Sequence, residues 1–166
     1  MTLEDLFATH AARLRRLGDL LLLDREESQE VVQEVFVKAY DVQGTASEPA
    51  DWARWLTRVT VNACHDRRRA GWWIQFRRRG ESIDALPLAT RDPTPEEMAV
   101  SAETARRIWR EFARLPRRQR EVFVLRYVAG SSTEEVAAML GVGAGSVKRH
   151  LFRAIRRLRA LMEDMQ

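Results

Sequence analysis

Apolar residues recur at helical spacing through most of the first 70 positions, which predicts three helices in this part of the chain. The first helix runs from residue 3 to about residue 23, and a short break follows at residues 24–25. Its apolar positions are Leu6, Phe7, Leu14, Leu17 and Leu21. A turn at residues 43–48 precedes the third helix, which should contain Pro49 in its first turn and run to about Arg69. The buried stripe of the third helix comprises Trp52, Leu56, Val59 and Ala63.

The second helix, between these two, is predicted to have one apolar face and one acidic face. Glu27, Glu30 and Glu34 cluster on one side of it. The apolar arc on the other side, about 180° wide at 100° per residue, comprises Val31, Val32, Val35, Phe36, Ala39 and Tyr40. An acidic face usually indicates only a solvated surface, but the same face also suits a basic partner helix.

The helical periodicity fails from residue 70 to residue 94, where glycines and prolines leave no coherent apolar face. We therefore predict two domains, residues 1–75 and residues 96–166, joined by a linker at residues 76–95. The segment 72–76, which contains Trp72 and Trp73, is unusually apolar for the start of a linker. It could extend the third helix, pack on the first domain or bind a partner.

Four more helices are predicted after the linker. Residues 94–97, Thr-Pro-Glu-Glu, form a capping box that opens the first, and Leu115-Pro116 opens the second, which runs to about residue 128. A second capping box at residues 132–135 opens a short helix to Leu140, and the last helix runs from about residue 144 to residue 162. No strand pattern competes with these helices. The predicted fold class is therefore all-α, with two small helical domains.

The spacing of three residues between 133 and 151 is typical of a helix-turn-helix. Ala137 is small where the two helices would cross, and Gly141 can adopt the left-handed conformation that such a turn needs. Val147 would fill the angle between the helices. An ordinary helical hairpin is the alternative, but the complete spacing favours a DNA-binding unit.

The last helix is predicted to expose a basic face with an aromatic ring at its centre. A solvated helix more often alternates the signs of its charges and gains little from an exposed ring. In a DNA major groove, cations can bind guanine edges and phosphates while a ring contacts a thymine methyl group. The predicted DNA-binding residues are Lys148, Arg149, Phe152, Arg153 and Arg156.

Composition and charge narrow the possible functions. The net charge is only +4, but residues 65–80 and 116–162 are two basic blocks, which suggests two contacts with a polyanion. Cys64 is the single cysteine, the three histidines are scattered, and no glycine-rich phosphate loop is present, so an enzyme or a metal site is disfavoured. No apolar run reaches the roughly 20 residues that span a bilayer. A cytoplasmic protein without membrane insertion or cofactor is expected.

Three motifs in this order resemble the extracytoplasmic-function sigma factors of bacterial RNA polymerase. Residues 27–36, ESQEVVQEVF, are similar to the polymerase-binding helix of that family, and residues 55–63, WLTRVTVNA, to its DNA-melting helix. Leu115-Pro116, residues 120–123 (REVF) and residues 145–148 (GSVK) resemble its fourth conserved domain. The resemblance covers residues 3–70 and 96–162 and implies a sigma region 2 domain followed by a sigma region 4 domain.

The resemblance implies partners and site residues. Glu30, Gln33 and Glu34 would face the clamp helices of the largest subunit of core RNA polymerase, and the second domain would contact the flap of the second subunit. Asn62 would bind a flipped base of the minus-ten promoter element, with Trp52 and Trp55 more consistent with core residues than with stacking platforms. Phosphate contacts beside the opened strand would come from Arg67, Arg68 and Arg69. The family also implies an anti-sigma factor as a partner.

Three other function classes remain as alternatives. A stand-alone helix-turn-helix regulator would bind duplex DNA without polymerase and would need no acidic polymerase-binding helix. A helical adaptor with incidental basic faces would bind no DNA at moderate salt. An enzyme would need a nucleophile or ligand set, whereas Cys64 is more consistent with a packing residue than with a nucleophile.

Overall fold

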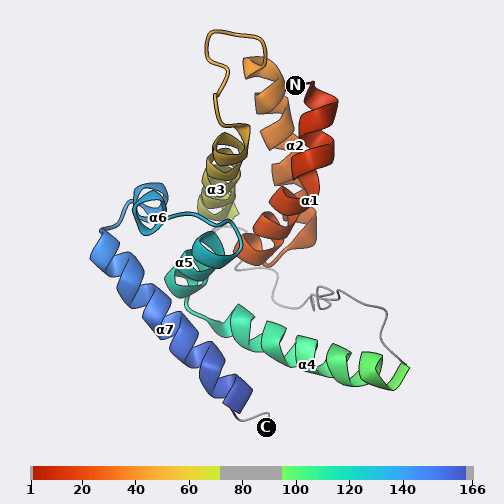
Figure 1. The fold of residues 1–166 in the computed structure, drawn as a ribbon, viewed down its shortest axis with the longest axis vertical. Coiled ribbons are helices and arrows are strands. Elements are labelled where there is room, and N and C mark those ends of the chain that lie inside the picture. The colour runs from red at the N-terminus through yellow and green to blue at the C-terminus, as the bar shows by residue number, and fades with distance from the viewer. Residues whose placement is uncertain (1, 72–94, 164–166) are drawn as a thin grey trace.

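A computed structural model describes residues 2–71 and 95–163 of the chain (Figure 1). These two ranges contain seven helices and no strand, which confirms the all-α fold class and the order of three helices followed by four. The helices are α1 (Leu3–Leu22), α2 (Arg25–Val42), α3 (Trp52–Gly71), α4 (Pro95–Arg114), α5 (Arg117–Tyr127), α6 (Thr133–Leu140) and α7 (Ala144–Glu163).

The first three helices pack side by side as one bundle, here called the N-terminal domain (Figure 1). The apolar faces of the three helices pack against one another, so the residues that recur at helical spacing form a common hydrophobic core. The fully buried side chains of this core include Leu6, Leu14, Leu17, Leu21, Val31, Val35, Leu56 and Val61. Trp52 is buried and Trp55 is half-buried against it, with ring centroids 5.5 Å apart, so both are packing residues in this structure.

The connection between α1 and α2 is tight. Leu23 ends α1 in a left-handed conformation with φ of 58°, and the Asp24 carboxylate then accepts a hydrogen bond from the backbone N–H of Glu27 at 3.0 Å. The two helices cross where Gly18 meets Ser28, because a Cβ atom on Gly18 would lie 2.4 Å from Ser28 Oγ. The absence of a side chain at residue 18 therefore sets how closely α1 and α2 approach.

The third helix begins later than the sequence predicted. Pro49 lies outside it, and α3 starts at Trp52, because Asp51 supplies the cap: its Oδ1 accepts a hydrogen bond from the backbone N–H of Arg54 at 2.9 Å. A carboxylate can satisfy a free N–H of the first turn, whereas proline only tolerates that position. The prediction of Pro49 in the first turn was wrong.

Two aromatic residues predicted on apolar faces are in fact exposed. Phe7 is 54% exposed and Tyr40 is 68% exposed, although both fit the helical period of their buried neighbours. The ring of Phe7 packs over Phe36, with centroids 4.9 Å apart, and Phe36 is buried. Ala39 and Leu6, the residues directly before Tyr40 and Phe7, are fully buried, so the neighbouring helices still cover this part of the chain. At 100° per residue, Tyr40 and Phe7 lie at the angular edge of the buried faces, and the periodicity predicted these faces wider than they are.

The last four helices form a second unit, here called the C-terminal domain, in which α7 packs against α4, α5 and α6 (Figure 1). Its buried apolar side chains are Phe112, Leu115, Val122, Val124, Leu125, Val136, Leu140, Val147 and Ala154. Trp109 stacks on Phe112 with centroids 5.6 Å apart and so extends this core along α4. The predicted capping residue Thr94 lies outside the described residues, as does the apolar segment 72–76.

The two domains are in direct contact. Helix α5 packs against α1, and α6 packs against α3, so the short helix of the predicted helix-turn-helix lies beside the predicted DNA-melting helix (Figure 1). No pattern in the sequence indicated these contacts between the domains. Several of the predicted site residues lie at this boundary.

Candidate nucleic-acid and polymerase interfaces

The turn between α6 and α7 has the geometry that the sequence predicted for a helix-turn-helix. Gly141 ends α6 in the left-handed region with φ of 63°, and the N–H of Val142 donates to the carbonyl of Ala137 at 3.0 Å. Val147 is fully buried in the angle between the helices. At the start of α6, Ser132 and Glu135 each accept a hydrogen bond from the backbone N–H of the other, which confirms the second capping box.

The basic face of α7 points away from the protein. Ala154 and Val147 bury the opposite side of the helix, so the face that remains is open to solvent. Phe152 is 66% exposed at its centre. The residues exposed with it are Lys148, Arg149, Arg153 and Arg156, and none of these four forms an ion pair within the described ranges. Four unpaired cations around an exposed aromatic ring form a surface suited to DNA, whose phosphates are anionic and whose base edges include apolar methyl groups.

The predicted polymerase-binding residues lie together on the outer surface of α2. Glu30, Gln33 and Glu34 are exposed there. Val37, which is 62% exposed, and Tyr40 continue the same side of the helix toward its C-terminal end. Sequence reasoning missed this apolar extension, because it assigned Tyr40 to the core and gave no role to Val37. The surface is therefore acidic at one end and apolar at the other.

Arg67 extends from α3 to this acidic surface and does not extend into solvent. Its Nη1 atom lies 2.7 Å from Glu27 Oε2 and 2.5 Å from Glu30 Oε2, and its Nη2 atom bonds Glu34 Oε1. The hydrogen bonds of Glu30, Glu27 and Glu34 raise the pKa of Arg67 above its ordinary value. The sequence predicted Arg67 as a phosphate contact, but its guanidinium is engaged within the protein.

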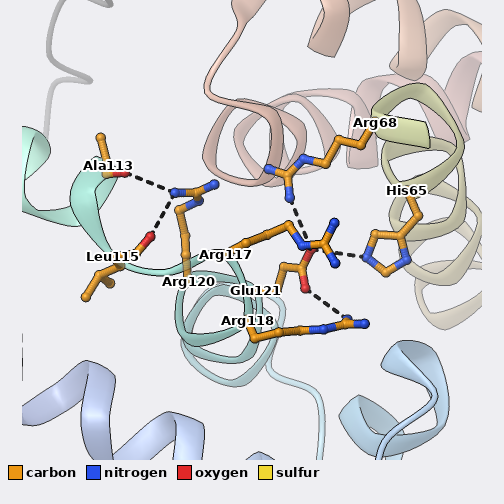
Figure 2. Close-up of polar contacts among 8 residues, drawn as sticks. All are labelled: His65, Arg68, Ala113, Leu115, Arg117, Arg118, Arg120 and Glu121. Carbon is orange, nitrogen blue, oxygen red and sulfur yellow. Dashed lines mark hydrogen bonds and ion pairs between the residues drawn. The ribbon is translucent and has the colours of Figure 1, made fainter. Parts of the chain in front are cut away.

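Arg68, the next predicted phosphate contact, is engaged across the domain boundary (Figure 2). Its Nη1 donates to Glu121 Oε1 at 3.0 Å, and Nε2 of His65 lies 3.5 Å from the same oxygen. Arg117 and Arg118 approach Glu121 from its own helix, at 3.6 and 3.1 Å. Of the three consecutive arginines, Arg69 is the one whose side chain is exposed.

Glu121 is the anion at the centre of this cluster and is only 1% exposed. Burial raises the pKa of Glu121, but its interaction with His65 and the charges of Arg118 and Arg117 outweigh burial, so the pKa lies below its ordinary value. Glu121 is therefore ionised at neutral pH. Arg120 lies beside it and donates to the carbonyls of Ala113 and Leu115, and burial lowers the pKa of Arg120 to about 10 (Figure 2).

Asn62 is exposed on α3 and lines a groove of about 530 Å³ between the two domains. Arg54 and Arg58 line the same groove from α3, and Ser131 and Glu135 line it from the C-terminal domain. Arg54 Nη2 and Glu135 Oε1 form an ion pair of 3.0 Å across it. The predicted base-binding residue Asn62 therefore faces the C-terminal domain in this structure. The groove is narrow enough for the side chains of Arg54 and Glu135 to meet across it.

Cys64 and possible clusters of metal-ligating side chains are the candidates for covalent or metal chemistry among the described residues. Cys64 is buried, and burial raises the pKa of its thiol to about 12, which disfavours the nucleophilic thiolate. No three His, Cys, Asp or Glu side chains converge as a metal site within residues 2–71 and 95–163. Among the described helices, none is both long enough and apolar enough to cross a bilayer.

Two family models match the chain, one in each domain. The model described as Sigma-70 region 2 matches residues 6–74, and the model described as Sigma-70, region 4 matches residues 105–158. The first match begins within α1 and includes all of α2 and α3, with Asn62 and the acidic face. The second runs from within α4 to within α7 and includes the basic face.

The chain is also similar to named relatives and to a solved structure. The chain is 33% identical over 159 residues to the ECF RNA polymerase sigma factor SigM of Mycobacterium tuberculosis, covering 96% of this chain and 76% of that protein. It is 30% identical to the RNA polymerase sigma-E factor of Streptomyces coelicolor, over 94% of this chain and 83% of that one. The fold matches the sigma factor RpoE of Bartonella quintana, solved in complex with the anti-sigma factor NepR, with a TM-score of 0.71, 21% identity and 96% of each chain covered.

Proposed function

Because the chain belongs to the extracytoplasmic-function family of RNA polymerase sigma factors, we propose that it binds core polymerase through α2 and promoter DNA through α3 and α7. Sigma factors of this kind initiate transcription without catalytic chemistry of their own. The observation that carries the proposal is the exposed basic face of α7, in which Phe152 is surrounded by unpaired cations on a helix-turn-helix.

We propose that Glu30, Gln33 and Glu34 dock on the clamp helices of the largest polymerase subunit. Their side chains are exposed on one side of α2, where opposite charge on a partner would steer association. Val37 and Tyr40 would add apolar area to this contact. The C-terminal domain would bind the flap of the second subunit, and a chain with these partners works in the cytoplasm, where polymerase and chromosome are.

We propose that α7 binds the minus-thirty-five element. Lys148 and Arg149 are on its first turns, the part of a recognition helix that reaches base edges, while Arg153 and Arg156 are one to two turns further along. The first pair would contact bases and the second pair phosphates. Phe152, between them, would contact a thymine methyl group.

We propose that Asn62 captures a base of the minus-ten element and that Arg69 contacts a phosphate beside it. An amide can both donate to and accept from a base edge, and Asn62 and Arg69 lie near each other on α3, seven residues apart. Arg68 could join them only after its ion pair with Glu121 breaks. Arg67 is held on the other side of α3 by three glutamates of α2, so the DNA contacts that we propose do not include it.

We also propose that an anti-sigma factor binds this chain and holds it inactive. The structural relative from Bartonella quintana was solved as such a complex, and the exposed apolar residues of α2 offer a surface for one here. Purification of the tagged chain from uninduced cells tests this. Recovery solely as free protein or with polymerase would count against the proposal.

Run-off transcription with purified core polymerase tests the main proposal. The chain with core polymerase should give defined transcripts, and either component alone should give none. A gel shift on the mapped promoters, with and without core polymerase, separates this function from that of a stand-alone helix-turn-helix regulator. Specific duplex binding at physiological salt without polymerase would favour the regulator.

A further inference from the structure

Arg67 connects two elements that the sequence assigned to different partners. It extends from α3, the proposed DNA-binding helix, and its guanidinium contacts three carboxylates of α2, the proposed polymerase-binding helix. Glu27, Glu30 and Glu34 are spaced at i, i+3 and i+7, which places them on one side of α2 over two turns. One cation of the third helix thus binds the whole acidic row.

The charge balance leaves this row acidic. Three carboxylates and one guanidinium carry a net charge of about −2, so a basic partner would still be attracted. The Arg67 side chain is only 24% exposed, whereas those of Glu27, Glu30 and Glu34 are 48, 60 and 48% exposed. The guanidinium of Arg67 therefore lies closer to the protein interior than the three carboxylates, which lie nearer the solvent. A partner approaching α2 would meet the carboxylates first.

The hydrogen bonds also leave accepting capacity on each carboxylate. Arg67 uses Oε2 of Glu27, Oε2 of Glu30 and Oε1 of Glu34, which is one oxygen of each group. A carboxylate can accept bonds at both oxygens, so each glutamate can hold Arg67 and a second cation at once. A glutamate side chain that is already fixed loses less entropy when a partner binds it.

We propose that Arg67 is a positioning residue of the polymerase-binding surface: it holds Glu27, Glu30 and Glu34 in one row for a basic partner helix and makes no promoter contact. The inference rests on the proposed binding of α2 to polymerase, and it adds Glu27 to that surface. Arg67 stays in place when polymerase binds, and it acts through the glutamates.

The test is the rate of association with, and dissociation from, purified core polymerase at several salt concentrations, for the full chain without DNA. Arg67→Ala removes the fixing cation but makes the row more negative. Dissociation should therefore become about tenfold faster, while association at low salt stays equal or becomes faster. Arg67→Lys, which keeps the charge but not the fork of donors, should fall between wild type and Arg67→Ala. Arg16→Ala removes the same charge from an exposed site on α1 and should change neither rate more than about twofold.

A double-mutant cycle shows whether Arg67 acts through the row. In a Glu34→Ala background, Arg67→Ala should increase the dissociation rate by clearly less than it does in wild type. Thermal unfolding of every variant identifies loss of fold, and a fold defect would not leave the association rate intact. Equal effects of Arg67→Ala in both backgrounds would overturn the proposal.

Two further outcomes would overturn it in other ways. Slower dissociation of Arg67→Ala would mean that Arg67 competes with polymerase for the glutamates. Unchanged polymerase rates, with a weaker salt dependence of promoter binding by the holoenzyme, would make Arg67 a phosphate contact. If Glu30→Ala and Glu34→Ala themselves leave polymerase binding intact, it is the proposed function of α2 that fails.

Discussion

Arg68 of α3 and Glu121 of α5 form an ion pair of 3.0 Å that joins the two domains, and Glu121 is almost completely buried at this boundary. The Glu121 carboxylate is contacted by Arg68 and His65 of the N-terminal domain. Arg117 and Arg118, on the same helix as Glu121, contact it as well. One anion thus balances several cations, so its loss would leave uncompensated positive charge at the boundary.

Replacement of Glu121 by Gln should destabilise the protein strongly. Removal of one partner from a buried ion pair typically costs about 3 to 5 kcal/mol, because the remaining charges keep their desolvation cost. We expect a loss of that size in the free energy of unfolding measured in urea. The control is Glu103→Gln, which removes an exposed glutamate paired with Arg106 and Arg110 on α4 and should cost about 1 kcal/mol or less. Equal losses for the two variants would contradict the conclusion that Glu121 is a buried carboxylate on which several cations depend.

The same carboxylate should make stability sensitive to acid. The folded-state pKa of Glu121 lies below its ordinary value of 4.5. The contribution of Glu121 to the free energy of unfolding is therefore complete at pH 7, and it is lost as the pH falls from about 4.5 through the folded-state pKa. The advantage of wild type over Glu121→Gln in free energy of unfolding should therefore be constant near neutral pH and shrink below 4.5. An advantage that grew toward acid pH would contradict this direction.

Introduction of a side chain at Gly18 should separate α1 from α2. A Cβ atom there would lie 2.4 Å from Ser28 Oγ, and overpacking of this kind typically costs about 1 to 3 kcal/mol. We expect Gly18→Ala to lower the free energy of unfolding by that amount, and Ser28→Ala in the same chain to recover part of it. Gly145→Ala, where an added Cβ meets nothing within 4 Å, is the matched control. A neutral Gly18→Ala would show that the Ser28 side chain or the two helices can shift without cost, and that Gly18 does not limit their approach.

The basic face of α7 should contain two classes of residue. Arg149→Ala should cost about 1 to 3 kcal/mol on the preferred minus-thirty-five sequence and relax discrimination there, because a bidentate contact to guanine is lost. Arg156→Ala should weaken binding to all sequences alike and reduce the salt slope by about one unit, the loss of one phosphate contact. Phe152→Ala should change preference more than salt slope, because a ring releases no counterions.

The measurement for all three variants is promoter binding by reconstituted holoenzyme across a salt series, on preferred and scrambled minus-thirty-five sites. Equal losses on both sites for Arg149→Ala would leave Arg149 as a phosphate contact only. A loss for Arg156→Ala confined to the preferred site would assign base contact to the later turns of the helix.

Local signals predicted the helices and the helix-turn-helix well. The cap at Ser132, the left-handed turn at Gly141 and the buried plug at Val147 each depend on residues within a few positions, and all three are confirmed. The start of α3 was missed because Asp51, and not Pro49, satisfies its first N–H groups. Phe7 and Tyr40 were misassigned because periodicity indicates which side of a helix is apolar but not how wide an arc of it the neighbouring helices cover: Leu6 and Ala39, next to them in the chain, are fully buried.

The partners of the site residues could not be predicted in the same way. Arg67 pairs with glutamates at least 33 residues away, and Arg68 pairs with Glu121 across 53 residues. A run of three arginines indicates only a basic segment, because each side chain leaves a helix in a different direction, about 100° from the next. Folding turns one arginine toward α2 and one toward the C-terminal domain, and leaves Arg69 exposed.

The groove between α3 and α6 sets a limit on how promoter DNA can be bound. The minus-ten and minus-thirty-five elements are named for their positions and so lie about 25 base pairs apart. At 3.4 Å per base pair, this is about 85 Å along straight duplex DNA. Here Arg54 of α3 and Glu135 of α6 are 3.0 Å apart, and the 20 residues of α7 extend only about 30 Å. A straight promoter is therefore too long for both elements to be contacted in this arrangement. If the proposed contacts of α3 and α7 are made to both elements of a straight promoter at once, the pairs Arg54–Glu135 and Arg68–Glu121 must break and the domains must separate.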